Sequence, residues 1–252
     1  MASGNGSNDA QNGSFTISGT DLKSNAVLNA GTYNIRVSAT DAAGNISAAQ
    51  TLTLTIDKTV GTPSLSLTCD SGFSSSDKIT NQGTITTGNL ESGALLEYST
   101  DGSTWDSTYA AAEGVNNVKV RVMDAAGNQR TQDYSFTLDS TAPTAAVLTL
   151  VCDSGSQAGD QLTNNGALNV VAEAGATLEY STNGSTWTST FAAADGANTV
   201  SVRVTDKAGN VSSTSSLSFT LDKTAPVAAS VSLVCDSGLT AVANNDKISH
   251  TG

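Results

Sequence analysis

Basic residues, histidine, aromatic residues and proline are all scarce in this chain of 252 residues. Lys and Arg number 11 against 23 Asp and Glu, so the formal net charge is −12. We expect no nucleic-acid partner, because phosphate contacts need clustered Lys and Arg. The single histidine, His250, lies next to the C-terminus, which argues against zinc-histidine, Ser-His and Cys-His sites. No apolar run is as long as a membrane span, so we expect no direct membrane insertion.

A repeat of about 83 residues organises the chain. The motif Asp-x-x-Gly-Asn occurs at 41–45, 124–128 and 206–210, and a ten-residue segment ending in Trp105 returns with little change, ending in Trp187. A unit of this length can build one small two-layer core, as in a β-sandwich. We divide the chain into an incomplete unit at 1–57, full repeats at 58–139 and 140–222, and the first strand and loop of a further repeat at 223–252.

Alternation of apolar and polar residues predicts, inside each repeat, strands with one buried face and one solvent-exposed face. The valines of 118–122 and of 200–204 alternate with polar residues, and the dipeptides at 101–102 and 183–184 are strong hairpin signals. No window has a helical stripe, so we predict an all-β chain of tandem antiparallel β-sandwiches with almost no α-helix. In the second repeat we expect seven strands, at about 64–69, 83–87, 94–99, near 105, 108–110, 117–123 and 132–138.

The three cysteines occupy one position in three repeats, because Cys69, Cys152 and Cys235 are each 83 residues apart. Each follows apolar residues two and four positions earlier, such as Leu67 and Leu65. This phase predicts a small buried hydrophobic residue on the core face of a strand. An intermolecular disulfide is the alternative.

In combination, these motifs resemble bacterial Ig-like repeats. The resemblance rests on Leu-Thr-Cys-Asp at 67–70, Asp-Lys-Ile-Thr-Asn at 77–81, the segment ending in Trp105, the Asp-x-x-Gly-Asn motifs, and Leu-Asp-x-Thr-Ala-Pro at 138–143. Such repeats form the extender regions of giant Gram-negative surface adhesins of the RTX, type I-secreted class. The stretch 15–36 resembles instead the second half of a bacterial cadherin-like repeat.

The resemblance implies a secreted, non-enzymatic spacer at the bacterial cell surface, with a role in cell adhesion and biofilms. It also implies that calcium stiffens the modules at their junctions, and that the partners of each module are its neighbours in the chain.

The order of strands and loops gives a geometric reason for calcium sites. The first strand of a repeat enters from the linker, so the loop after it lies at the far end, while Asp-x-x-Gly-Asn lies at the near end. Stacking the second repeat on the third should gather Asp70, Asp77, Asp139, Asp206 and Asn210. Clustered carboxylates repel one another without a cation, and Ca²⁺ accepts roughly six to eight oxygens. The candidate calcium ligands are Asp57, Asp70, Asp77, Asp124, Asn128, Asp139, Asp153, Asp160, Asp206, Asn210, Asp222, Asp236 and Asp246.

Other interpretations of these motifs stay open. Asp-x-x-Gly-Asn also suits a plain turn with glycine at positive φ. We expect no catalytic residues, because the acidic positions recur in every repeat. A carbohydrate- or receptor-binding module is an alternative function, and it would need Trp105 and Trp187 exposed on one flat face.

A further alternative concerns self-association. By repeat alignment, the chain begins where a second strand begins and ends just before the next one. The tail, with Val231, Leu233 and Cys235, could complete the first unit of another molecule and build head-to-tail filaments. An arbitrary boundary is the simpler interpretation.

Overall fold

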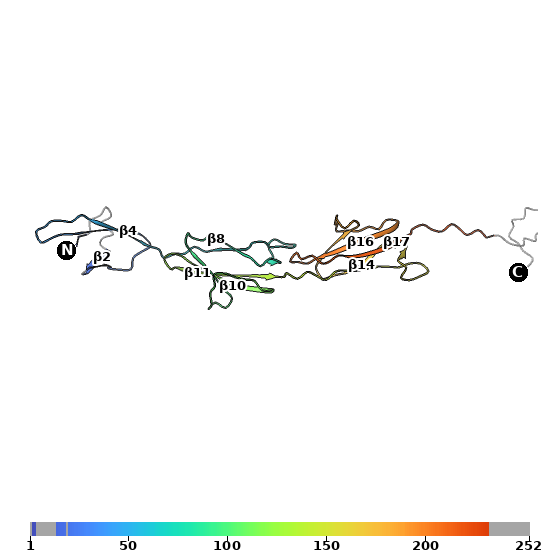
Figure 1. Ribbon diagram of the computed structural model, residues 1–252, viewed down its shortest axis with the longest axis horizontal. Helices are drawn as coiled ribbons and strands as arrows, with labels where there is room; N and C mark the ends of the chain where they lie inside the picture. Colours follow the sequence, from blue (N-terminus) through green and yellow to red (C-terminus); the bar gives the residue numbers. More distant parts are fainter. Residues whose placement is uncertain (1, 4–13, 19, 232–252) are drawn as a thin grey trace, which may run out of the picture. The chain divides into compact units, whose positions relative to one another are not determined.

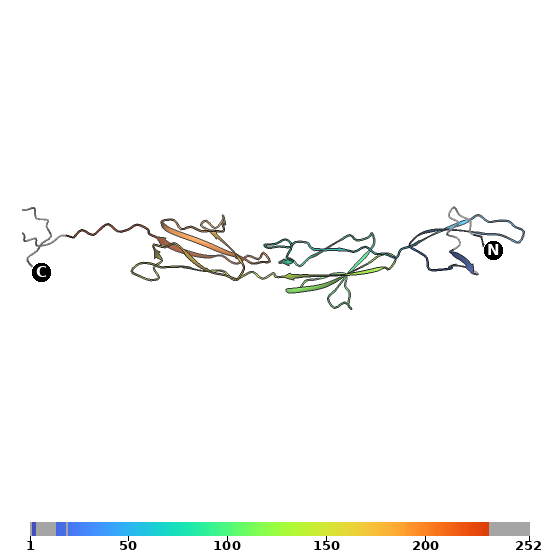
Figure 2. The ribbon, with the colours of Figure 1, turned by 180° about the vertical axis from the view of Figure 1, so that it is seen from behind.

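All secondary structure in the described part of the chain is β (Figures 1 and 2). The structure, a computed structural model, describes residues 2–3, 14–18 and 20–231. They fall into two compact units. Unit 1 comprises Met1–Ala145, Ala172–Leu178 and Arg203–Ser213, and unit 2 comprises Ala146–Val171, Glu179–Val202 and Thr214–Gly252. The predicted all-β class with antiparallel sheets is confirmed.

The first repeat contributes five strands. They are β1 (Ala2–Ser3), β2 (Phe15–Ser18), β3 (Asp21–Ser24), β4 (Gly31–Ala39) and β5 (Gln50–Ile56). β2 and β3 form a hairpin, and β4 lies between β1 and β5 in an antiparallel sheet. Ile35 on β4 is buried, while Leu52 opposite it on β5 is half exposed. Among its described residues this repeat therefore buries little apolar surface.

The second repeat is a two-layer sandwich. One layer pairs β6 (Ser64–Leu67) with β8 (Ile85–Gly88). The other has the order β7-β11-β10-β9 and is built from β7 (Ile79–Thr80), β9 (Leu95–Ser99), β10 (Gly114–Met123) and β11 (Gln129–Leu138). β7 runs parallel to β11, and the other neighbours are antiparallel.

The core of the second repeat lies between these layers. Val118 and Val120 on β10 and Tyr134 and Phe136 on β11 are buried. Half-buried apolar side chains from both layers, Leu65 among them, pack against these four. The strand periodicity read from the sequence is thus confirmed at β10 and β11, because alternate residues face the core.

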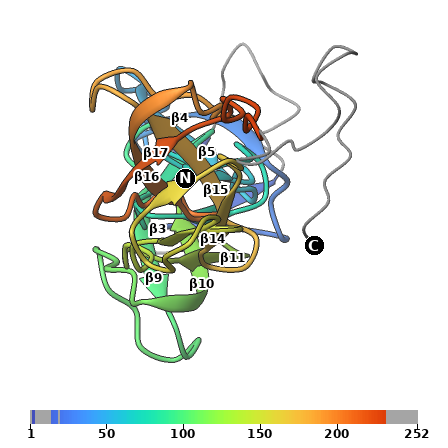
Figure 3. The same ribbon diagram turned by 90° about the vertical axis from the view of Figure 1, so that its right-hand side faces the viewer.

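The third repeat follows the same plan. Its strands are β12 (Val147–Leu150), β13 (Leu162–Thr163), β14 (Leu168–Val171), β15 (Thr177–Ser181), β16 (Gly196–Thr205) and β17 (Ser215–Leu221). β12 pairs with β14, and the second sheet has the order β13-β17-β16-β15. β16 and β17 lie side by side (Figure 3). Val200, Val202 and Val204 on β16 are fully buried, as their spacing predicts.

Two strand predictions for the second repeat were wrong. No strand forms at 108–110, and near Trp105 a single bridge joins Tyr98 to Asp106. β7 was missed because it is only two residues long and pairs in parallel with β11, so it shows no alternation. A side-chain bond fixes this short strand, since the Thr80 hydroxyl donates to the Cys69 carbonyl at 2.8 Å.

The prediction of buried cysteines was also wrong for the two that the structure describes. Cys69 and Cys152 are exposed free thiols. The alternation holds as far as Leu67, which packs on the core, but β6 ends there. The chain then turns so that the carbonyl of Cys69 meets β7, and its side chain leaves the core face. Cys235 lies outside the described residues.

The predicted hairpin turns form, and a single side chain organises each one. In the second repeat, Asp101 Oδ1 accepts the N–H groups of Ser103 and Thr104 at 2.7 and 2.8 Å, and Gly102 has φ of +75°. In the third repeat, Asn183 Oδ1 accepts the corresponding N–H groups at 2.9 and 2.8 Å. The Thr104 and Ser103 N–H groups and the Ser99 hydroxyl hold the pKa of Asp101 well below its ordinary value of 3.8.

This turn predicts a specific acid sensitivity. Because the folded-state pKa of Asp101 is depressed, its stabilisation is complete above pH 3.8 and is lost as pH falls through the folded-state pKa. Asp101→Asn should fold almost as stably at pH 7, since Asn183 holds the same turn without a charge. Urea unfolding at pH 7 and at about pH 2.5 should show a smaller loss of stability in the variant than in the wild type. Equal losses in both proteins would contradict this role.

Candidate metal site

The Asp-x-x-Gly-Asn loops are tight turns held by their own aspartate. Asp124 Oδ1 accepts the N–H groups of Ala126 and Asn128, each at 2.9 Å, and Asp124 Oδ2 accepts the Asn128 amide at 2.8 Å. Gly127 supplies φ of +89°. The Asn128 side-chain bond, with the backbone bonds, lowers the pKa of Asp124 although its burial opposes this. The loop at 41–45 repeats the pattern, and the Asn45 amide likewise lowers the pKa of Asp41.

The asparagines that end the second and third motifs, Asn128 and Asn210, also fix the linker that precedes their repeat. The Asn128 amide donates to the backbone carbonyl of Asp57 at 3.1 Å, and the Asn210 amide donates to that of Asp139 at 2.7 Å. In the second repeat, Asp57 thereby lies beside the motif residue Asp124. The sequence motifs predict Asn128 and Asn210 as ligands themselves; in the structure the side-chain amide of each binds the backbone of a linker aspartate that is also a candidate ligand.

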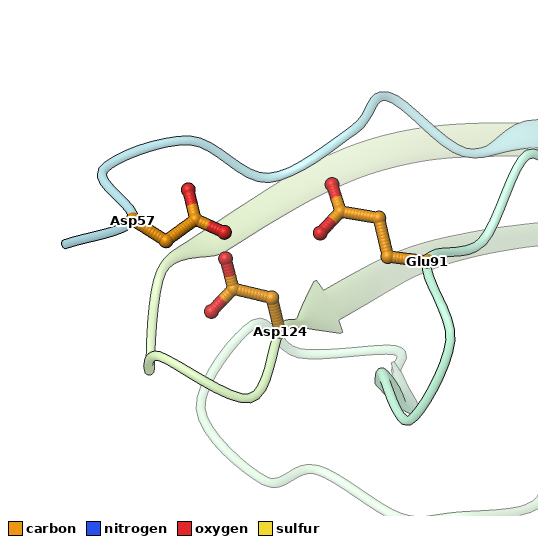
Figure 4. A group of neighbouring side chains, drawn as sticks. All are labelled: Asp57, Glu91 and Asp124. Atoms are coloured by element: carbon orange, nitrogen blue, oxygen red, sulfur yellow. The ribbon is translucent and has the colours of Figure 1, made fainter. Parts of the chain in front are cut away.

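Three carboxylates meet at the start of the second repeat. Asp57 comes from the linker, Glu91 from the loop between β8 and β9, and Asp124 from the end of β10. One carboxylate oxygen from each lies within 4.8 Å of the others. Figure 4 shows the three side chains pointing toward one another from three separate segments. Asp57 and Glu91 are exposed and Asp124 is buried, so the cluster opens to solvent on one side.

The hydrogen bonds leave part of this cluster open. Glu91 Oε1 accepts the Gly61 N–H at 2.7 Å, and Asp57 Oδ1 accepts the Thr59 N–H at 3.1 Å. Glu91 Oε2 and Asp57 Oδ2 accept no hydrogen bond from the residues that the structure describes. Two carboxylate oxygens with free lone pairs beside a third carboxylate form a hard-oxygen donor set of the kind that calcium takes.

Asp57 and Asp124 are candidate ligands from the sequence motifs, whereas Glu91 is not among the predicted ligands. The sequence does contain a signal for Glu91, because a glutamate recurs at the same place in the next repeat, Glu173, 82 residues later. It was overlooked because the residue lies in a loop with no motif around it.

The loop between the first two strands holds its own aspartates. Asp70 Oδ2 accepts the Lys78 N–H at 3.1 Å, and Asp153 Oδ2 accepts the Gly159 N–H at 2.7 Å. The other carboxylate oxygen, Oδ1, of both Asp70 and Asp153 is buried and has no hydrogen-bond partner within the described parts of the chain. Asp77 and Asp160 each accept the N–H two residues later, which is a turn role.

Asp70, Asp77, Asp139 and Asp206 do not form a group of three carboxylates within 4.8 Å among the described residues. A calcium site made by these residues stays a prediction. The remaining candidates are placed as follows: Asp222 accepts the Thr224 N–H at 2.8 Å, and Asp236 and Asp246 lie outside the described residues.

The tryptophan of the second repeat does not form an open platform. Trp105 is half-buried, and the Arg121 guanidinium lies 4.1 Å from its ring centre. Glu97 in turn binds Arg121 at 2.7 Å. One ring face is therefore covered, which favours a packing role over a sugar-binding surface.

Family comparisons agree with this architecture. Residues 141–223 match a family described as "Bacterial Ig-like domain", and residues 2–58 match a second family with the same description. Both segments are therefore similar to bacterial Ig-like domains. Domains of this kind are typically non-catalytic structural modules and are commonly extracellular. Within the described residues, no helix is long and apolar enough to cross a membrane.

Two solved structures show weak similarity to this chain. The fibronectin(III)-like modules of Clostridium thermocellum CbhA align with 12% identity and a TM-score of 0.37, over 64% of this chain and 94% of that one. The human desmocollin-1 ectodomain aligns with 15% identity and a TM-score of 0.18, over 90% of this chain and 52% of that one. A comparison with curated proteins gave no match.

Proposed function

We propose that this chain is a non-enzymatic extracellular spacer segment of a bacterial surface adhesin, and that calcium stiffens it at the Asp57–Glu91–Asp124 cluster. The observation that carries the proposal is the cluster itself, because it joins three segments that are far apart in sequence. The linker residue Asp57 would be tied to two loops of the repeat that follows it.

The chemistry of the cluster supports a divalent cation. Three carboxylates within 4.8 Å carry up to three negative charges, and their mutual repulsion favours separation unless a cation neutralises it. A bound calcium ion would supply that neutralisation and would cross-link the linker to the repeat. Exposure of Asp57 and Glu91 leaves room for water to complete the coordination shell.

The tandem architecture supports the spacer role. Two repeats have the same sandwich plan, and the strand patterns that build it recur at the same positions. The polar side chains of the Asp-x-x-Gly-Asn motifs hydrogen-bond to the backbone of their own turns and of the linkers, so they order the backbone there. The bacterial Ig-like family and the acidic composition are in keeping with an exported, soluble segment.

Calorimetric titration with calcium tests the proposed site. Glu91→Gln keeps the oxygen that accepts the Gly61 N–H but removes a charge, so it should weaken calcium binding at this cluster by tenfold or more, about 1.4 kcal/mol. Asp133→Asn, which removes a charge that pairs with Lys119 outside the cluster, is the matched control and should bind as the wild type does. The same calcium affinity in Glu91→Gln and the wild type would reject the assignment.

A further inference from the structure

Two glycine-containing loops of consecutive repeats meet at close range within unit 1. The first is the Ser71–Gly72 turn after β6, and the second is the Asp-x-x-Gly-Asn loop of the third repeat. The Ser71 hydroxyl donates to the Ala208 carbonyl at 2.6 Å. A Cβ placed on Gly72 would lie 1.9 Å from the Lys207 carbonyl oxygen, and one placed on Gly209 would lie 2.9 Å from the Gly72 nitrogen.

These distances require glycine on both sides. A Cβ within 3.0 Å of backbone would force one of the two loops to move. Ala208, between Lys207 and Gly209, is fully buried. The contact is therefore backbone packed on backbone, closed by one hydroxyl bond, and it involves no carboxylate.

A hydrogen bond within its own repeat orients the Ser71 side chain toward this contact. Its oxygen accepts the Asn81 N–H at 2.8 Å, and its hydroxyl can donate to the Ala208 carbonyl at 2.6 Å or to Asn81 Oδ1 at 3.0 Å, of which the Ala208 contact is the shorter. Ser154 accepts the Asn164 N–H at 2.7 Å in the same way one repeat later. Both such loops that the structure describes thus hold their serine in this way, while the bond to Ala208 is made by Ser71.

We propose that Ser71–Gly72 and Lys207–Gly209 form a metal-independent latch, in which the loop after the first strand of one repeat recognises the Asp-x-x-Gly-Asn loop of the next. The partner that fits the Ser-Gly surface is the backbone of a second Ig-like repeat of the same type. The Asn210 amide, which donates to the Asp139 carbonyl at 2.7 Å, holds the second loop on the linker beside the latch.

The chain supplies matched controls for each half of the latch. Gly127 corresponds to Gly209 and has nearly the same φ, +89° against +93°, yet a Cβ on Gly127 would meet no atom within 4 Å. Gly155 corresponds to Gly72 and also has positive φ with open space around it. Alanine at either member of a pair brings similar backbone strain, so a difference within the pair reports the latch alone.

Hydrogen exchange of the full chain in chelator tests the latch. Gly209→Ala should speed amide exchange several-fold in both 70–73 and 206–210, whereas Gly127→Ala should leave 70–73 unchanged. Ser71→Ala should likewise speed exchange in 206–210, whereas Ser154→Ala should not. Circular dichroism confirms that each variant is folded before exchange is measured.

Two results would overturn the latch. One is equal effects of Gly209→Ala and Gly127→Ala on exchange in 70–73, together with equal effects of Ser71→Ala and Ser154→Ala on exchange in 206–210. The other is exchange of 70–73 in the wild type as fast as that of 153–156 after correction for intrinsic rates. Because calcium is absent throughout, failure of the latch and failure of the calcium site are separate outcomes.

Discussion

Millimolar calcium is expected to raise the melting midpoint of this protein by at least several degrees over its value in chelator. A ligand that binds only the folded state adds about 2.7 kcal/mol of stability at a hundredfold excess over its Kd. For a domain of this size, each kcal/mol moves the midpoint by roughly 4–8 °C. The second repeat has a small core, built around Val118, Val120, Tyr134 and Phe136 with half-buried neighbours, so such a gain is a large part of its stability.

Differential scanning calorimetry of the full chain measures this shift. Glu91→Gln should lose most of the calcium-dependent rise, because it removes a charge from the cluster, while Asp133→Asn should keep it. Magnesium at the same concentration should give a smaller rise, since it demands a tighter octahedral shell and gives up water reluctantly. Superimposable melts in calcium and chelator would refute calcium stabilisation.

Phe136→Ala is expected to cost about 3–5 kcal/mol, the largest effect of any single substitution considered for this chain. Phe136 is only 3% exposed, and its ring meets Tyr109 edge-on at 6.5 Å and Tyr134 at 6.0 Å. Removing it opens a cavity between the two sheets that the strands cannot fully close. A loss of this size is enough to unfold a marginal domain.

Urea unfolding of the full chain gives the cost for the second repeat. The third repeat, with Phe219 at the equivalent position, serves as an internal reference whose transition should not move. Val115→Ala, on the neighbouring strand β10 but 71% exposed, is the matched control and should change stability by less than about 0.5 kcal/mol. A cost below about 1 kcal/mol for Phe136→Ala would show that the sandwich core lies elsewhere.

The parts of the fold that could be predicted are those where one side chain decides the outcome locally. Alternating valines on β10 and β16 determine which face is buried, and glycines at 102 and 127 determine where the chain turns. The short parallel strand β7 could not be predicted this way. It depends on pairing with β11, more than fifty residues later in the chain, and on the Thr80 bond to Cys69.

In the candidate site, too, the features set by local sequence could be predicted, and those set by contacts between distant segments could not. Asp57 and Asp124 stand in recognisable motifs, so their residue type and spacing pointed to oxygen ligands. Their proximity depends on the Asn128 amide reaching the Asp57 carbonyl, and Glu91 joins them only because the β8–β9 loop lies beside the linker. The prediction that Cys69 is buried was wrong for a related reason, because the alternation of apolar and polar residues does not show where a strand ends.

X-ray diffraction from crystals of the full chain grown in millimolar calcium tests the central claim most directly. Anomalous scattering should reveal a peak between Asp57, Glu91 and Asp124, with carboxylate oxygens at about 2.3–2.6 Å from the ion. Crystals grown in chelator should lack the peak and should show the Asp57 and Glu91 carboxylates farther apart. A cluster without an anomalous peak in calcium, with the three carboxylates arranged as in chelator, would contradict the calcium-stiffened spacer.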